Sequence, residues 1–263
     1  VSENRPEWAI ADQGILSIGA INVPFYVTLP AAQIAGLLHD SEGCAIIVST
    51  QVQLENVLSI ASKLPGLRQI VVMDVVTGAP PQVMRFATLQ EIGRSALSED
   101  GAAYQAMRQE VHASDVASII YTSGTTCLSK GVMLMHRNIL TNVLDCAEVF
   151  DLSASDVTLS FLPLCHIFQR TVDYLMLHCG VSIAYAESFE TVPQNLQEVH
   201  PTAVSSVPRF FEKMYGRNKE AIRSGPPQKQ KLMAWALGVG KDYSQKILHK
   251  EPVSSLLKLK HTL

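Results

Sequence analysis

The chain has 263 residues, of which 47% are hydrophobic and 17% charged, and this composition excludes a largely disordered chain and allows one large core or two smaller ones. No apolar run approaches the ~20 residues that a membrane-spanning helix needs, and no charged-then-apolar leader opens the sequence, so we expect a soluble protein. The five cysteines have no C-x-x-C spacing, which disfavours a disulfide framework and favours a cytoplasmic location.

The first third of the chain alternates between helical and strand patterns. Apolar residues recur at helical spacing over residues 6–19 and 28–43, and Asn4 is the expected cap of the first helix. Strand, helix and strand then follow in an order that predicts an α/β fold, with parallel strands, right-handed crossovers and helices against the sheet. These three elements are expected over residues 44–48, 54–64 and 69–73.

The rest of the chain continues with elements of the same kinds. Two β-branched or apolar runs, over residues 116–121 and 131–135, are joined by a connection rich in Ser, Thr and Gly. Weaker patterns predict surface helices over residues 88–97 and 102–111. The remaining expected elements are helices over residues 138–150, 172–177 and 207–214 and strands over residues 158–162 and 181–185.

The connection between the two β-branched runs has the composition of a phosphate-binding loop. Its hydroxyl groups, the backbone N–H groups around Gly124 and the three donors of Lys130 can surround phosphate oxygens and offset their charge. It is not a Walker loop, because Ser129 rather than Gly precedes Lys130 and Gly131 follows it. A plain polar linker is the alternative, but such linkers seldom place Lys-Gly and an apolar strand at this spacing. The segment reads Tyr121-Thr122-Ser123-Gly124-Thr125-Thr126-Cys127-Leu128-Ser129-Lys130-Gly131.

This segment, continued by Val-Met-Leu-x-His, resembles the signature of the adenylate-forming superfamily of acyl-CoA synthetases, peptide-synthetase adenylation domains and luciferases. Residues 160–174, with Cys165-His166 at their centre, resemble a second motif in the form typical of long-chain fatty-acyl-CoA ligases. Residues 4–8 resemble the opening βα unit of the superfamily and residues 207–215 resemble its long-chain branch, so the matches cover nearly the whole chain in the family's order.

The resemblance implies a function and a set of site residues. It implies that a long-chain fatty acid is activated with ATP to acyl-AMP and then transferred to coenzyme A, with Mg²⁺ on the phosphates. Lys130 and His166 would be the catalytic residues, with His166 beside the substrate carboxylate, although a structural histidine is the alternative. Thr122 would also be a protein ligand of the metal. The implied nucleotide-binding residues are Thr122, Ser123, Gly124, Thr125, Thr126, Lys130 and Gly131.

The sequence departs from the family pattern at Cys127 and at Ser129, where Pro is common but Ser is a tolerated variant, and it lacks later family motifs. Family members usually have Gly where Cys127 stands, and a side chain at a position with positive φ would cost on the order of 1 kcal/mol and crowd the nucleotide. The later glutamate motif, the ribose-binding aspartate motif and a C-terminal domain with its catalytic lysine are not found. We therefore expect residues 1–263 to be part of an N-terminal AMP-binding domain, with 1–112 as a first α/β portion and 113–263 carrying the phosphate loop and acyl pocket.

Alternative functions stay open. The chain could be a noncatalytic nucleotide- or acyl-binding module, or part of an adenylating enzyme with another acid or acceptor. Residues 212–263 carry eleven Lys and Arg against four Asp and Glu, which suits a solvated helix face or peripheral membrane contact near Trp235. Nucleic acid is disfavoured, because no zinc-finger spacing, RNP-like aromatic run or Arg-rich arm accompanies the charge. The oligomeric state cannot be read from the sequence.

Overall fold

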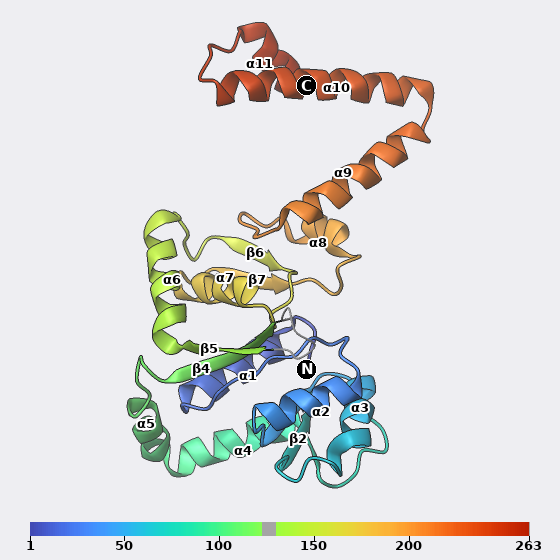
Figure 1. Ribbon diagram of the computed structural model, residues 1–263. Helices are drawn as coiled ribbons and strands as arrows, with labels where there is room; N and C mark the ends of the chain where they lie inside the picture. The colour runs from blue at the N-terminus through green and yellow to red at the C-terminus, as the bar shows by residue number, and fades with distance from the viewer. Residues whose placement is uncertain (123–129, 263) are drawn as a thin grey trace. The chain divides into compact units, whose positions relative to one another are not determined.

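A computed structural model describes residues 1–122 and 130–262 (Figure 1). The chain forms two compact units, Val1–Ser205 and Ser206–Leu263. The first unit is a mixed α/β structure and the second contains helices α9, α10 and α11. The predicted α/β fold class is therefore confirmed.

The first unit opens with two helices and a parallel sheet. Helix α1 (Pro6–Ser17) has Pro6 at its first position, where a missing N–H breaks no helical hydrogen bond, and α2 (Ala31–Asp40) follows. Strands β1 (Ala45–Val48) and β2 (Gln69–Val72) pair in parallel on either side of α3 (Gln51–Ala61), as the strand-helix-strand pattern predicts. Strand β3 (Val83–Arg85), which the sequence patterns did not predict, adds in parallel to give the order β1-β2-β3.

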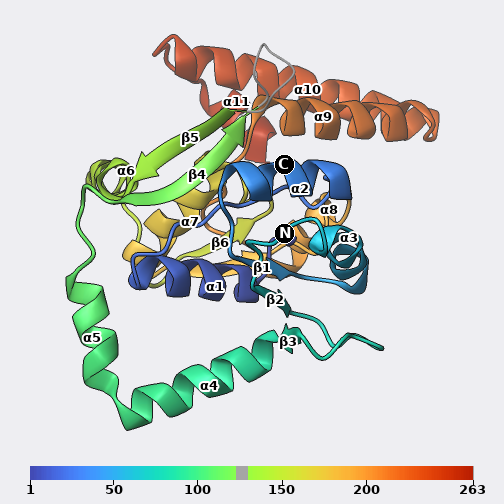
Figure 2. The same cartoon turned by 60° about the horizontal axis from the view of Figure 1, so that its bottom comes forward.

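Two surface helices lead to an antiparallel hairpin. Helices α4 (Phe86–Glu99) and α5 (Gly101–Gln109) match the expected surface helices, and the Asp100 carboxylate caps α5 by accepting from the Ala103 N–H at 3.1 Å. Strands β4 (Val116–Thr122) and β5 (Lys130–Met135) then pair antiparallel. Figure 2 shows the two strands side by side, with α6 (His136–Val149) following β5.

A second parallel pair completes the first unit. Strands β6 (Val157–Ser160) and β7 (Ser182–Tyr185) flank α7 (Ile167–His178), and α8 (Val192–Val199) comes last. Helix α7 begins five residues earlier than the expected helix over residues 172–177, because His166 caps it. Strand β6 stops at Ser160, two residues short of the expected 158–162, where the chain turns toward Pro163.

Two apolar cores are described in the first unit. The main core joins one face of α2 and α3 to β1 and β2 through Ile34, Leu38, Val48, Leu54 and Val72. A smaller core between α6 and α7 contains Ile139, Val143 and Leu175, with Ala117 of β4 packed against them.

The second unit contains α9 (Pro208–Arg223), α10 (Pro227–Leu248) and α11 (Ser255–Thr262). Helix α9 begins close to the expected position but runs nine residues beyond 214, and the sequence patterns predicted neither α10 nor α11. Within the described ranges, no helix combines the length and apolar character needed to cross a membrane.

Candidate functional site

The β4–β5 hairpin presents the two ends of the predicted phosphate loop next to each other. Thr122 and Lys130 are paired across the hairpin, and both are exposed. Side chains of directly paired residues leave the same face with Cβ atoms about 5 Å apart. The hydroxyl of Thr122 and the ammonium of Lys130 therefore emerge side by side. Four predicted nucleotide-binding residues, together with Cys127, lie outside the described residues: Ser123, Gly124, Thr125 and Thr126.

Gly131 has a packing role at this end of the hairpin. It lies opposite Tyr121, and a Cβ placed on it would come within 2.8 Å of Ile119 Cγ2 and 3.3 Å of the Tyr121 ring. The phenol of Tyr121 crosses to α2 and donates to a carboxylate oxygen of Asp40. Burial and then this bond raise the pKa of Tyr121 to about 12, so the phenol keeps its proton. Gly131 thus allows the contact that fixes the hairpin end against α2.

His166 is the N-cap of α7 and is exposed. Its Nδ1 accepts a hydrogen bond from the Phe168 N–H at 3.3 Å, so in the neutral imidazole Nε2 carries the proton. An exposed N–H at a helix N-terminus, where the helix dipole is positive, is well suited to binding an anionic oxygen.

A buried arginine fixes α7 against α1 and β4. Arg170 is 0% exposed and its guanidinium binds both carboxylate oxygens of Asp12, with Nε at 3.1 Å from Oδ2. Its Nη1 donates to Ser118 Oγ at 2.6 Å, and Nε also lies 2.7 Å from the Tyr174 hydroxyl. A buried guanidinium is tolerated only when its donors find acceptors. Arg170 lies one helical turn after His166, so this cluster sets the position of the His166 end of α7.

A second polar cluster holds the turn between β6 and α7. Asp173 accepts from Gln169 at 2.7 Å and from Ser160 at 3.1 Å, and burial raises its pKa to about 6 against these hydrogen bonds. Asn4 donates to the carbonyl of Leu162 at 2.7 Å and accepts from the N–H of Leu164 at 3.1 Å. The prediction that Asn4 caps α1 was wrong: Arg5 occupies that position, and the Asn4 amide binds the turn before His166 instead.

Gln169, Arg170 and Asp173 are buried polar residues of the motif over residues 160–174, but sequence reasoning did not single them out. Their signal is a pair of i, i+4 contacts on one helix, Gln169 with Asp173 and Arg170 with Tyr174. Among the described residues, no hydrogen bond or ion pair joins His166 to Thr122 or Lys130. The structure therefore brings Thr122, Lys130 and Gly131 together, and holds His166 on a separate element.

The residues present are compatible with Mg²⁺ shared with a nucleotide. Thr122 offers one neutral hydroxyl oxygen, and the part of the chain that the structure describes has no group of three His, Cys, Asp or Glu residues that would hold a metal. Mg²⁺ is commonly bound by one or two protein oxygens together with substrate phosphates. This donor set fits such shared binding better than a structural metal.

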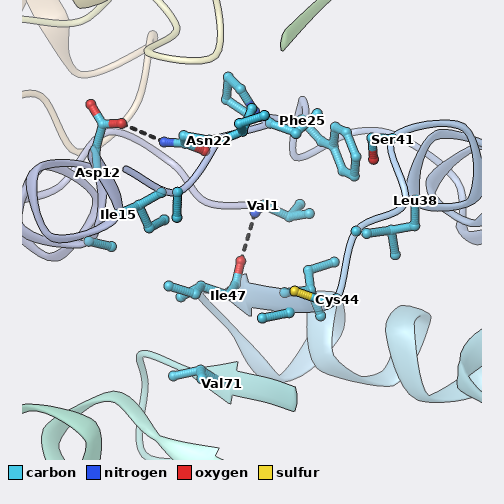
Figure 3. A pocket seen from close by; sticks show the side chains of 18 of the residues that line it. Val1, Asp12, Ile15, Asn22, Phe25, Leu38, Ser41, Cys44, Ile47 and Val71 are labelled. Carbon is cyan, nitrogen blue, oxygen red and sulfur yellow. Dashed lines mark hydrogen bonds between the residues drawn. The ribbon is translucent and has the colours of Figure 1, made fainter. Parts of the chain in front are cut away.

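A cavity of about 710 Å³ lies elsewhere in the first unit (Figure 3). Residues of α1, the segment after it, α2 and β1 line the cavity, and none of the predicted site residues does. It is therefore separate from the proposed nucleotide contacts at Thr122 and Lys130.

The chain is similar to known acyl-activating proteins. It is 30% identical over 230 residues to the peroxisomal long chain acyl-CoA synthetase 6 of Arabidopsis thaliana, which covers 87% of this chain and 33% of that protein. It is also 30% identical over 265 residues to the long-chain-fatty-acid–CoA ligase FadD15 of Mycobacterium bovis, covering 100% of this chain and 42% of that protein. The chain thus spans about a third to two fifths of these relatives.

Solved structures share the fold. The crystal structure of the anthranilate CoA ligase AuaEII with anthranoyl-AMP superposes with a TM-score of 0.66 at 22% identity, over 80% of this chain and 40% of that one. The family model described as AMP-binding enzyme matches residues 1–258. The chain therefore belongs to the AMP-binding enzyme family.

Proposed function

We propose that this chain is the nucleotide-binding part of a ligase that uses ATP to activate a long-chain fatty acid to acyl-AMP and then to acyl-CoA. The observation that carries the proposal is the strand-paired position of Thr122 and Lys130, at the two ends of a Ser-, Thr- and Gly-rich segment. Similarity to long-chain acyl-CoA synthetases supports the substrate class. Residues 1–112 then form the first α/β portion, and residues 113–263 carry the phosphate loop and part of the acyl pocket.

The first step places negative charge at the hairpin end. A carboxylate oxygen of the fatty acid attacks the α-phosphorus of ATP, the bond to the pyrophosphate oxygen breaks, and acyl-AMP forms. The Lys130 ammonium offsets the charge on the phosphate oxygens, and backbone N–H groups of the connecting segment bind the same oxygens. Bound Mg²⁺ would withdraw further charge from them, with the Thr122 hydroxyl as a protein ligand.

His166 acts on the acyl end of the reaction. Its Nε2–H donates to an oxygen of the substrate carboxylate and then of the mixed anhydride, which orients the carbonyl carbon. In the second step the thiol of coenzyme A gives its proton to solvent and its sulfur attacks that carbon, the bond from the carbon to the AMP phosphate oxygen breaks, and acyl-CoA and AMP are formed. Burial of the alkyl chain contributes ~0.8 kcal/mol per methylene to binding, so long acids are favoured over short ones.

Fatty-acid-dependent exchange of pyrophosphate into ATP tests the first step. In the full-length protein, Lys130→Ala should lower exchange with palmitate by about a hundredfold, because one preorganised charge is lost from the transition state. Lys63→Ala, at an exposed lysine on the turn after α3, is the matched control and should leave exchange unchanged. Equal exchange rates in the two variants would exclude a role for Lys130. A preference for benzoate or acetate over palmitate would overturn the long-chain assignment.

A noncatalytic nucleotide-binding role is the second candidate, because Cys127 stands where members of the resembled family usually have Gly. Binding of ATP by residues 1–263 without palmitate-dependent exchange would favour this role. Strong exchange by the same chain would exclude it.

We also propose that the protein is cytoplasmic and contacts membranes peripherally through α10. Leu232 and Trp235 are exposed and one helical turn apart on this helix, which also carries Lys229, Lys231 and Lys241. Such residues bind anionic bilayers by apolar insertion and charge attraction. Flotation with anionic and neutral vesicles at low and high salt tests this contact, and binding that ignores both variables would contradict it.

A further inference from the structure

Asp40 ends helix α2 at a position where a carboxylate is usually unfavourable. It is the last residue of the helix, where the terminal carbonyls carry partial negative charge and disfavour an anion. Among the described residues, no ion pair with a Lys, Arg or His side chain offsets this charge. The carboxylate instead accepts a hydrogen bond from the Tyr121 phenol of β4, 81 positions along the chain. A residue that is unfavourable in its own helix but bonded at long range is expected to serve something outside that helix.

The end of α2 that carries Asp40 is fixed by hydrogen bonds and by packing. The Ser41 hydroxyl donates to the carbonyl of Leu37 at 2.7 Å, and the Gly43 N–H donates to the carbonyl of Leu38 at 2.9 Å. The Leu38 side chain is 5% exposed and belongs to the main core. A Cβ placed on Gly43 would come within 2.7 Å of it, so the chain packs closely on Leu38 as it leaves the helix. Asp40 therefore stands on a well-held support.

The ring of Tyr121 has a second contact, with Phe25. The two rings meet edge to face, with 6.4 Å between their centres and 61° between their planes, and Phe25 is itself 5% exposed. Figure 3 shows Phe25 on the side of the pocket where Leu38 and Ser41 lie. Ring contacts are favourable over a range of orientations, whereas a hydrogen bond is directional. Phe25 thus gives Tyr121 contact area, and Asp40 gives it a direction.

The direction of Tyr121 determines where the hairpin end presents its polar groups. Tyr121 directly precedes Thr122, which is paired with Lys130. Successive side chains of a strand leave opposite faces, so Thr122 and Lys130 emerge on the face away from the Tyr121 phenol. Rotation of the strand end about its own axis would break the bond to Asp40 and move both groups. The bond therefore restrains the hydroxyl and the ammonium together.

We propose that Asp40 is a positioning residue for ATP: its carboxylate holds the Tyr121 phenol, and the hairpin end then presents Thr122 and Lys130 to the phosphate oxygens. This inference rests on the proposed function, because it takes the hairpin end as the nucleotide site. Asp40 acts through Tyr121 and does not itself contact the nucleotide. Without the bond both phosphate-binding groups are still present, but they sample more orientations, and ATP binds less tightly.

Pyrophosphate exchange by the full-length protein tests the proposal through the KM for ATP and the KM for palmitate. Asp40→Ala and Tyr121→Phe each remove the hydrogen bond, and Asp40→Asn keeps an acceptor oxygen for the phenol. Asp145→Ala, which removes an exposed aspartate from α6, is the matched control. Calorimetric titration with ATP and Mg²⁺ in the absence of palmitate gives a Kd that does not depend on turnover. Unfolded molecules lower the apparent kcat and leave KM unchanged, so KM separates positioning from loss of structure.

Asp40→Ala and Tyr121→Phe should each raise the KM and the Kd for ATP about tenfold, which corresponds to the loss of one hydrogen bond, and should leave the KM for palmitate within about twofold. The combined variant should bind ATP no more weakly than either single one, because both changes remove the same bond. Asp40→Asn should stay within about threefold of the unchanged protein, because its amide oxygen accepts from the phenol. Asp145→Ala should match the unchanged protein.

Three results would each overturn the positioning role: an ATP KM in Asp40→Ala equal to that in Asp145→Ala, losses that multiply in the combined variant, or an Asp40→Asn variant as weak as Asp40→Ala. Lys130→Ala, measured beside them, distinguishes this failure from failure of the proposed function. If Lys130→Ala leaves exchange and the Kd for ATP unchanged, the hairpin end is not the nucleotide site and both proposals are wrong. If Lys130→Ala weakens both while Asp40→Ala weakens neither, only the role of Asp40 is wrong.

Discussion

Removal of the Asp12 carboxylate should destabilise the first unit severely. Asp12 is 1% exposed and accepts from the Arg170 guanidinium, the Asn22 amide and the Tyr174 hydroxyl. In Asp12→Ala the hydrogen-bond partners left to the guanidinium among the described residues are the hydroxyls of Ser118 and Tyr174, and the charge stays buried without a counter-charge. Breaking a buried pair in this way costs about 3–5 kcal/mol, which is a large part of the 5–15 kcal/mol by which domains are usually stable.

Urea unfolding followed by tryptophan fluorescence measures this loss of stability, provided that the fluorescence comes from the first unit, Val1–Ser205. The chain has two tryptophans, Trp8 and Trp235, so a Trp235→Phe background leaves Trp8 as the reporter. Trp8 is well placed, because the Arg170 guanidinium carbon lies 5.6 Å from its ring centre.

Two control variants distinguish the cost of an unpaired buried charge from the cost of losing any carboxylate. Asp74→Ala removes a carboxylate that pairs with Arg5 at 2.8 Å but is 40% exposed, and should cost no more than about 1 kcal/mol. Asp12→Ala combined with Arg170→Met should be more stable than Asp12→Ala alone, because the unpaired charge is gone. Equal costs for Asp12→Ala and Asp74→Ala, or a double variant weaker than the single one, would refute the reasoning.

Three further predictions use neighbouring residues. Burial raises the pKa of Asp173 to about 6, above its value in the unfolded chain, so the folded state binds more protons than the unfolded state between pH 4 and 6. The free energy of unfolding should therefore fall by up to about 3 kcal/mol as the pH rises from 4 to 6. Urea titrations at each pH measure this fall, and Asp173→Asn should flatten it. Gly131→Ala should cost about 1–3 kcal/mol, since the new Cβ would meet Ile119 at 2.8 Å, whereas Gly93→Ala, in open space on α4, should not destabilise. Cys127→Gly in the full-length protein should raise ATP affinity or turnover, and identical kinetics would count against the crowding argument.

Short-range patterns accounted for much of the fold. The apolar spacing of α1, α2 and α3 and the short apolar runs of β1 and β2 predicted both the elements and their parallel pairing, because a strand-helix-strand crossover permits little else. The three-residue strand β3 was missed, since it is too short for alternation and depends on β2 for its hydrogen bonds. Helix α10 was missed because its apolar residues, such as Leu232, Trp235 and Leu237, are spread around the helix.

The site was predicted less completely than the fold, because much of its support is long-range. The two β-branched runs predicted strands on either side of the loop, but not the antiparallel pairing that places Thr122 opposite Lys130. The hydrogen bond from Arg170 to Asp12 joins residues 158 positions apart, and that from the Leu164 N–H to the Asn4 amide oxygen joins residues 160 positions apart. No local spacing contains that information.

The distribution of polar groups along residues 160–174 separates two tasks within one motif. Gln169, Arg170 and Asp173 are 5% exposed or less, and they bond to other parts of the first unit. His166 is the exposed residue at the end of the same helix, with one ring nitrogen used by the cap and the other free to donate. Substitutions at the buried positions should therefore lower stability and affect catalysis only through the position of α7. Substitution of His166 should affect catalysis directly and cost only about the 1 kcal/mol of a lost helix cap. A motif of this kind identifies the fold chiefly through its buried residues, and the inference to chemistry rests on the few exposed groups that those residues hold in place.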